Sequence, residues 1–243
     1  MTDTRAAAFL AAFVLSCGCA ASAPRAAPAT GRQIAHSASG TQYLLYLPGA
    51  HERADAWPLI LFLHGGGERG EDLSLVRREG LPRILENVPD FPFVVVSPQE
   101  TLARRWTPDG LARLLDEVVA KHRVDPTRVY ATGLSSGATS ALELAAARPD
   151  RIAAVAAVSP NRLPPDVCRL KDVPVWMFHN SGDPRIPAGR IRRFERALAR
   201  CGGDVRVTLY DRASHDAWTE TYDRRDLYEW LLNHRAGTAR IRR

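Results

Sequence analysis

The residues best suited to chemistry in this chain form the pentapeptide Gly133-Leu134-Ser135-Ser136-Gly137. It follows an apolar stretch typical of a buried strand (128–132) and precedes an alanine- and leucine-rich stretch typical of a helix (138–147). In that context a G-x-S-x-G pattern places the serine on a sharp turn, and the flanking glycines leave room for neighbouring backbone. We therefore expect Ser135 to be a nucleophile and the backbone N–H of Ser136 to donate to the developing oxyanion. The alternative is a Gly/Ser turn without chemistry.

A nucleophilic serine needs a base, and the chain has seven histidines. Six belong to the N-terminal hairpin region, to strand ends or to helix ends: His36, His51, His64, His122, His179 and His234. His215 lies in a loop after the last expected strand, and ligands of an open parallel sheet bind at the carboxyl ends of its strands, so this loop can reach Ser135. The orienting acid should follow the penultimate strand, where Asp183 lies, with Asp211 and Asp216 as alternatives.

The chain order Ser135, Asp183, His215 is one of the orders in which a serine–acid–histidine triad occurs. In such a triad His215 takes the Ser135 proton during attack on an acyl carbon and then protonates the leaving group, while Asp183 holds the imidazole tautomer. A second oxyanion donor is expected from the glycine-rich loop 64–70 (HGGGERG), with Gly66 as the candidate. A phosphate-binding loop is the alternative interpretation, but no Lys-Ser/Thr pair follows this stretch.

Strands and helices alternate along the rest of the chain. Apolar runs typical of buried strands cover 42–47, 58–63, 93–97, 128–132, 153–159, 173–178 and 205–210. Helical periodicity marks 111–119, 138–147, 191–198 and 226–233. The first strand is expected to pair with the segment before Gly40. This alternation predicts a single α/β domain, a mostly parallel central sheet with helices on both faces.

The N-terminus has the composition of an export signal. Arg5 precedes ten apolar residues (6–15) and then small residues, and ten helical residues rise only about 15 Å, half a bilayer. The sequence Val14-Leu15-Ser16-Cys17 is similar to a lipoprotein box, Cys19 is the second candidate for acylation, and cleavage near 20–23 without lipidation is the alternative. We expect an exported protein of the bacterial periplasm or cell envelope, or a secreted one, with membrane contact only through such an anchor.

We expect the chain to divide into an export signal (1–23), a flexible linker (24–32) and a catalytic domain (33–243). Export would place Cys168 and Cys201 in a compartment that permits disulfides. On the expected fold both lie just before neighbouring strands, so a bridge is geometrically feasible, with two free buried thiols as the alternative.

The composition is that of a globular protein, with 45% hydrophobic and 25% charged residues among 243. The formal net charge is +6 at pH 7, which raises the question of a nucleic-acid partner. Lys occurs only at Lys121 and Lys171, and Arg is spread along the chain between Asp and Glu. Because nucleic-acid binders concentrate basic residues on one element, we expect no nucleic-acid partner.

Several motifs in order resemble the α/β-hydrolase superfamily, and more narrowly the small bacterial carboxylesterases described as prolyl-oligopeptidase-like or phospholipase/carboxylesterase-like. They are HGGGERG (64–70), FPFVVVSPQ (91–99), GLSSG (133–137), ARPDRIAAV (147–155), VPVWMFHNSGDPRIP (173–187) and SHDAWTETY (214–222). The resemblance implies the triad Ser135, Asp183 and His215. The chain departs from the usual pattern at Ser136 (usually Met), Ala138 (usually Gly) and Asn180, where a His-Gly pair is more usual.

The same resemblance predicts an open cleft without a large lid, since lids in this fold commonly follow the sixth strand and only about a dozen residues separate Ser159 from Val173. Trp106 and Trp218 lie in expected loops on the active face and are candidates for substrate binding. We expect no cofactor and no metal. The sequence favours an exported serine esterase acting on small-molecule or polymer-borne esters. The alternatives are a serine peptidase of the prolyl-oligopeptidase-like type, acyl transfer to another acceptor, and a non-catalytic hydrolase-fold binding protein.

Overall fold

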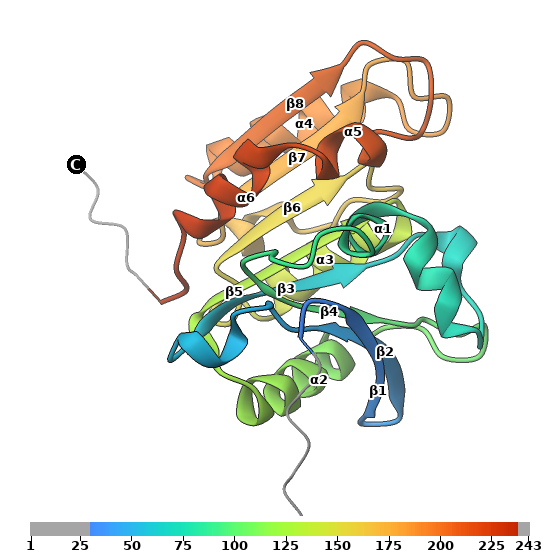
Figure 1. Ribbon diagram of the computed structural model, residues 1–243. Coiled ribbons are helices and arrows are strands. Elements are labelled where there is room, and N and C mark those ends of the chain that lie inside the picture. Colours follow the sequence, from blue (N-terminus) through green and yellow to red (C-terminus); the bar gives the residue numbers. More distant parts are fainter. Residues whose placement is uncertain (1–29, 238–243) are drawn as a thin grey trace, which may run out of the picture.

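A computed structural model describes residues 30–237, which form one eight-stranded sheet with helices on both faces (Figure 1). The strands are β1 (Gln33–Ala38), β2 (Thr41–Tyr46), β3 (Trp57–Leu63), β4 (Val94–Pro98), β5 (Val124–Leu134), β6 (Ala154–Val158), β7 (Val175–Asn180) and β8 (Val205–Tyr210). The helices are α1 (Gly80–Leu85), α2 (Pro108–Lys121), α3 (Ser136–Ala147), α4 (Ala188–Arg200), α5 (Trp218–Tyr222) and α6 (Arg225–Leu232). Short 3₁₀ turns are η1 (His51–Arg53), η2 (Gly66–Glu68), η3 (Leu73–Arg78) and η4 (Val167–Leu170).

The strand order is β1-β2-β4-β3-β5-β6-β7-β8. The hairpin β1–β2 is antiparallel and β2 pairs antiparallel with β4, whereas all other pairs are parallel. The carboxyl ends of β3 to β8 therefore lie along one edge of the sheet, and the loops that follow these strands meet there. The expectation of a single α/β domain with a mostly parallel sheet is confirmed.

Two apolar layers separate the sheet from its helices. Helices α2, α3 and α4 bury their apolar stripes on one face, and α1, α5 and α6 cover the other (Figure 1). Four of the five residues expected to form the apolar stripe of α2 are buried, namely Leu111, Leu114, Leu115 and Val118, and the fifth, Val119, is partly buried. Thr107 caps this helix by accepting a hydrogen bond from the N–H of Gly110 at 3.1 Å.

The expected elements differ from the structure mainly where the elements are short. Helices α1 and α5 were not expected, because helices of six and five residues are too short to show a 3.6-residue period. Trp218 was expected in a loop, but it is the first residue of α5. Strand β5 begins at Val124, earlier than expected, and its pairing with β3 shifts register between Trp57 and Leu59.

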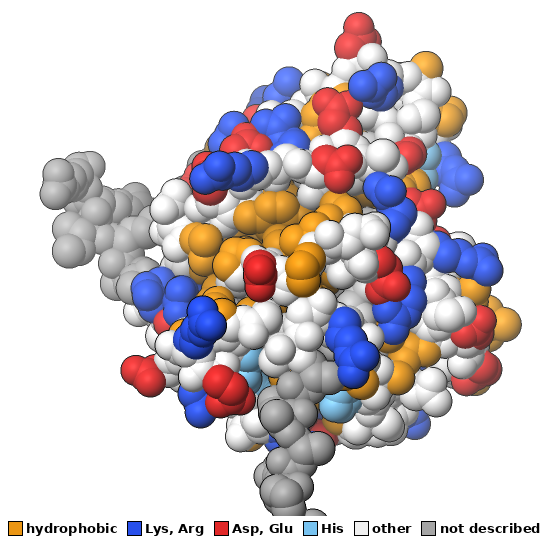
Figure 2. All heavy atoms as spheres, viewed as in Figure 1, with side chains coloured by type: hydrophobic (Ala, Val, Ile, Leu, Met, Phe, Trp, Pro, Cys, Tyr) orange, Lys and Arg blue, Asp and Glu red, His pale blue; other side chains and the backbone are white. Residues whose placement is uncertain are grey.

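The surface mixes charges of both signs. Figure 2 shows Lys and Arg side chains interspersed with Asp and Glu over the visible face, with hydrophobic side chains exposed between them. Several arginines form ion pairs with acidic side chains, as in Arg148 with Asp109 at 2.5 Å and Arg162 with Glu143 at 2.7 Å. Within residues 30–237, no helix is long and apolar enough to cross a membrane.

Candidate active site

The turn between β5 and α3 presents Ser135 in a backbone conformation that side chains rarely adopt, with φ of 52° and ψ of −112°. The glycines on either side are sterically required. A Cβ on Gly137 would lie 1.9 Å from the carbonyl oxygen of Leu63, and one on Gly133 would lie 2.5 Å from the same atom. The N–H of Ser135 also donates to the carbonyl of Val158 in β6 at 2.9 Å. The turn is thus pressed between the ends of β3 and β6, which fixes the direction of the serine.

The three residues expected to form a triad lie in one hydrogen-bonded line. His215 Nε2 lies 3.0 Å from Ser135 Oγ, and His215 Nδ1 lies 2.7 Å from Asp183 Oδ2. The Asp183 side chain is fully buried, and 10% of the His215 side chain is exposed. The arrangement allows the imidazole to accept a proton from the serine while the carboxylate holds its opposite nitrogen.

The loop after β7 keeps Asp183 ionised. Burial alone would raise the pKa of this carboxyl, but the hydrogen bond from His215 and the N–H groups of Arg185 (2.7 Å) and Ile186 (3.1 Å) hold its pKa below the usual value. His179 supports the same loop, because its Nε2 lies 2.8 Å from the carbonyl oxygen of Ile186. Burial lowers the pKa of His179, which favours a neutral ring that donates from Nε2.

The two residues that carry the candidate oxyanion donors, Gly66 and Ser136, lie close together. Ser136 is the first residue of α3, so its N–H has no acceptor within the helix. Gly66 begins η2 on the other side, and a Cβ on it would lie 3.9 Å from Ser136 Oγ. The space between Gly66 and Ser136 is therefore narrow, and two backbone amides can converge there on an oxygen bound to the acyl carbon.

Residues 99–230, more than half of the chain, match the family model described as the dienelactone hydrolase family. The chain belongs to the dienelactone hydrolase family. The match begins just after β4 and includes the serine turn, the acid loop and the histidine loop. The resemblance to α/β hydrolases expected from the motifs is thereby confirmed.

Individual relatives of this dienelactone hydrolase family member have been assigned as esterases. The chain is 32% identical over 180 residues to NocK of Nocardia uniformis subsp. tsuyamanensis, assigned as an esterase, with 66% of this chain and 50% of NocK covered. A thermostable esterase structure matches with 26% identity and a TM-score of 0.68, covering 84% of this chain and 62% of that one. Thermogutta terrifontis esterase 2 with bound butyrate has 17% identity and a TM-score of 0.59, and the match covers 80% of this chain and 90% of that one. The chain spans about half the length of NocK and about three-fifths of the thermostable esterase.

The glycine-rich loop of this family member is anchored by the end of β4. His64 Nε2 accepts a hydrogen bond from the N–H of Glu100 at 2.9 Å, and His64 Nδ1 lies 2.7 Å from the carbonyl oxygen of Gly65. Gln99 donates from Nε2 to the carbonyls of Glu68 (2.6 Å) and Gly70 (3.0 Å). Sequence reasoning assigned His64 to a strand end and gave Gln99 no role. The only signal was their position in two motifs, HGGGERG and VVVSPQ, because their partners are backbone groups far away in the chain.

The buried His64 makes stability sensitive to mild acid. Burial lowers the pKa of His64 to about 4, so between pH about 6.5 and about 4 the unfolded chain binds a proton that the folded chain excludes. Above about pH 6.5 His64 is neutral in both the folded and the unfolded chain, so its titration should not change the free energy of unfolding. As the pH drops from about 6.5 to about 4, the titration of His64 should lower the free energy of unfolding by about 3 kcal/mol. Urea denaturation at a series of pH values measures this, with His64→Gln as the comparison. Equal slopes for the two proteins between pH 6.5 and 4 would contradict it.

The two tryptophans have different partners. The ring of Trp218 meets the ring of His215 edge-on with centroids 5.5 Å apart, and its Nε1 donates to Glu79 at 3.1 Å. The ring of Trp106 packs edge-on against His64, with centroids 4.6 Å apart. Trp106 also lines a cavity of about 310 Å³ at the start of α2, whose lining residues include Arg104, Arg105 and Arg113. Arg105 pairs with the buried Glu100 at 3.0 Å.

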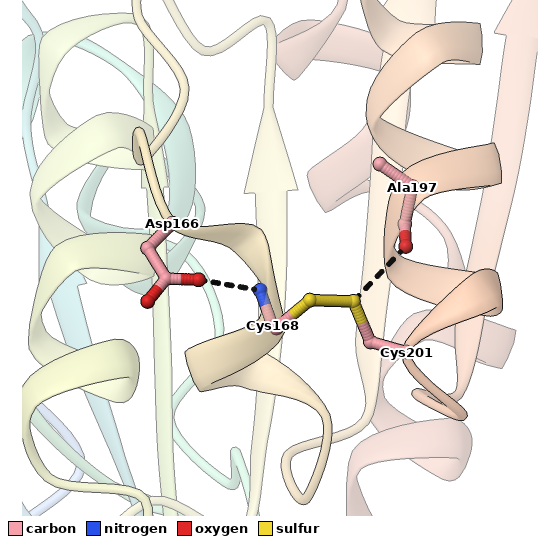
Figure 3. The surroundings of a disulfide bond; sticks show 4 residues. All are labelled: Asp166, Cys168, Ala197 and Cys201. Carbon is pink, nitrogen blue, oxygen red and sulfur yellow. Dashed lines mark hydrogen bonds between the residues drawn. A yellow bond between two sulfur atoms is a disulfide. The ribbon is translucent and has the colours of Figure 1, made fainter.

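A disulfide bond joins Cys168 of η4 to Cys201 at the end of α4 (Figure 3). Their Cα atoms are 5.4 Å apart and 33 positions separate them in the chain. Asp166 accepts a hydrogen bond from the N–H of Cys168 at 3.2 Å, which caps η4 beside the bridge (Figure 3). The bridge fastens the segment after β6 to the helix that precedes β8.

The other two cysteines, Cys17 and Cys19, lie outside the described residues, as do the expected export signal (1–23) and most of the linker (24–32). Strand β1 begins at Gln33, directly after that linker. Within residues 30–237, no group of three or more His, Cys, Asp or Glu side chains is placed to hold a metal ion.

Proposed function

We propose that this protein is a serine esterase that hydrolyses carboxylic esters through an acyl-enzyme on Ser135. The observation that carries the proposal is the line Ser135–His215–Asp183, with His215 within hydrogen-bond distance of both partners. Support comes from the proximity of Gly66 to Ser136 at the N-terminus of α3, and from the relatives assigned as esterases.

In the first half of the reaction, His215 Nε2 takes the Ser135 proton while Oγ attacks the acyl carbon. The carbonyl oxygen becomes an oxyanion, which accepts hydrogen bonds from the N–H groups of Ser136 and Gly66. The tetrahedral intermediate collapses when the imidazolium protonates the departing alkoxide, which leaves as an alcohol. In the second half His215 takes a proton from water, the hydroxide oxygen attacks the acyl-enzyme, and the carboxylic acid leaves as Ser135 recovers its proton.

We propose that Trp106 and Trp218 bind the two ends of the ester. The ring of Trp218 lies edge-on to the ring of His215, the residue that protonates the leaving group, with centroids 5.5 Å apart. Trp106 borders the cavity that Arg104, Arg105 and Arg113 line. Only 16 residues connect β6 to β7 apart from the strands themselves, and they include η4, so the site would be open to esters carried on polymers as well as to small esters.

We propose that the arginine-lined cavity beside Trp106 holds the acyl end of the ester, which sets a preference among substrates. Arg113→Gln should lower kcat/KM about fivefold for a nitrophenyl ester whose acyl chain ends in a carboxylate, because a partly exposed ion pair contributes about 1 kcal/mol. For the neutral ester of equal length the change should be less than twofold. Arg200→Gln, which removes an exposed arginine at the end of α4, is the matched control. Equal losses on both esters would show that the cavity does not hold the substrate's anionic end.

We propose in addition that the protein is exported, with residues 1–23 as its signal and with acylation at Cys17 or Cys19. The charged start and the apolar run 6–15 support this proposal. The bond between Cys168 and Cys201 is of the kind that persists in oxidising compartments. Fractionation of cells that express the full chain, followed by mass spectrometry of the mature N-terminus, tests it. A full-length N-terminus in the cytoplasm would contradict export, and an unmodified N-terminus near 20–23 would contradict acylation.

The proposed activity is tested with nitrophenyl acetate, butyrate and octanoate beside prolyl and alanyl nitroanilides. We expect hydrolysis of the esters and slow or undetectable cleavage of the anilides. Faster cleavage of the anilides would replace the esterase proposal with a peptidase. A folded protein that neither hydrolyses any of these compounds nor reacts with a fluorophosphonate would point to a binding protein.

A further inference from the structure

The last residue of β7, Asn180, makes contacts on both sides of the catalytic histidine. Its side chain is completely buried. Its Nδ2 donates to the carbonyl oxygens of Ser214 at 2.8 Å and Asp216 at 2.9 Å, and lies 3.1 Å from Ser214 Oγ. The two carbonyls belong to the residues immediately before and after His215. Because Nδ2 faces three oxygens, the amide nitrogen and not its oxygen must point this way.

The hydrogen bonds of Asn180 fix the loop around His215, which lies beyond the end of the pairing between β7 and β8. The pairing of β7 with β8 extends past Tyr210 as far as the N–H of Gly182, which donates to the carbonyl of Arg212 at 3.0 Å. Beyond that point the chain leaves the sheet and carries His215 over its carboxyl edge. Asn180 therefore connects this loop to the strand from which the acid loop departs.

We propose that Asn180 is a positioning residue that sets the orientation of His215. Fixing the backbone on both sides of a histidine leaves only its two side-chain torsions free, and hydrogen bonds to Asp183 and Ser135 define these. Without the amide, two partly buried carbonyls lose a donor and the loop has room to shift. A shift of about 1 Å at a catalytic group is enough to slow a reaction about a hundredfold.

The last two residues of β7, His179 and Asn180, thus support the loops that carry the two triad partners of Ser135. His179 holds the carbonyl of Ile186 in the acid loop, and Asn180 holds the carbonyls of the base loop. A glycine at this position would have no side chain and could not make these bonds.

The inference rests on the proposed ester hydrolysis, and its test has a readout that does not depend on an ester. Asn180→Ala and Asn180→Ser are compared with wild type in kcat and KM on nitrophenyl butyrate, in the rate of labelling by a fluorophosphonate, and in the low-field proton resonance of the His215–Asp183 hydrogen bond. Thr132→Val is the control, because Thr132 is also buried and hydrogen-bonded, to Ala156 and Tyr222, away from the triad.

We expect Asn180→Ala to lower kcat and the labelling rate about ten- to a hundredfold, to leave KM within twofold, and to weaken or shift the low-field resonance. Asn180→Ser keeps one donor and should fall between alanine and wild type, which also serves if the alanine variant does not fold. Thr132→Val should lose thermal stability with kcat unchanged. In a His215→Ala background, Asn180→Ala should cause no further loss.

Three results would overturn the inference: an unchanged kcat, labelling rate and resonance in a folded Asn180 variant, an equal loss of kcat in Thr132→Val, or a further tenfold loss in the His215→Ala background. Failure of the proposed function gives a different result. In that case the wild-type protein hydrolyses no ester although the fluorophosphonate labels Ser135, and the labelling rates and the resonance still decide the role of Asn180.

Discussion

Ser135→Ala is expected to lower kcat for ester hydrolysis by at least about three orders of magnitude, while the protein stays folded. The loss follows because no other group in the line Ser135–His215–Asp183 can form the acyl-enzyme, and the oxyanion donors alone leave only a residual rate. Steady-state kinetics on nitrophenyl butyrate measure it. Circular dichroism and the thermal midpoint of both proteins establish that the fold is intact. Retention of more than about a tenth of the activity would mean that another residue is the nucleophile.

Comparing Ser135→Gly with Ser135→Ala separates the chemical role of the serine from the backbone strain at its position. This variant should be as inactive as alanine but more stable than it, by about 1 kcal/mol, since glycine adopts a φ of 52° without the steric cost that any side chain bears. Denaturant unfolding of the two variants under identical conditions gives the difference. An alanine variant at least as stable as the glycine variant would show that the turn stores no strain at Ser135.

Gly137→Ala is expected to have the largest effect on folding. The added Cβ would lie 1.9 Å from the carbonyl oxygen of Leu63 and 2.4 Å from that of His64, and both atoms belong to backbone that cannot move independently of β3. Separating α3 from the end of β3 would disturb the buried layer between them. We expect a loss of about 4 kcal/mol or more, enough to leave much of the protein unfolded or insoluble.

Gly189→Ala is the matched control for this substitution. Gly189 lies in the first turn of α4, and a Cβ on it meets no atom within 4 Å. Alanine there should be neutral or stabilise the protein by up to about 1 kcal/mol, since it favours the helix and restricts the unfolded chain. Expression yield and the urea midpoint of both variants test the pair. A Gly137→Ala protein with the stability of wild type would mean that the serine turn is looser than the structure indicates.

The sequence was most informative where a local pattern and the fold require the same thing. Strand–turn–helix around Ser135 predicted the nucleophile, and the rule that loops meet at the carboxyl edge of a parallel sheet selected His215 and Asp183 from their rivals. The structure brings these three together, whereas Asp211 and Asp216 hold other partners: Ser181 for the first, Thr219 for the second.

The sequence was uninformative where side chains hold distant backbone. Gln99 supports a loop about 30 positions earlier, and Asn180 supports one about 35 positions later, through carbonyl groups that every residue has. No residue type at the receiving end marks such a bond, so spacing cannot reveal it. Helix α5, which begins at Trp218, also could not be predicted from the sequence. It gains its stability from packing against the rest of the protein and not from its own five residues.

The placement of the serine turn between the ends of β3 and β6 has a consequence for how activity arises during folding. Leu63, Ser135 and Val158 come from strands that begin at residues 57, 124 and 154, so the turn is complete only after three segments far apart in the chain have assembled. Contacts of this range form slowly, because the intervening loops lose entropy before any bond compensates for it. The serine turn therefore cannot take this conformation while any of the three segments is outside the sheet. We expect catalytic activity during refolding to be regained only with the complete sheet, and not with the helices or the first paired strands.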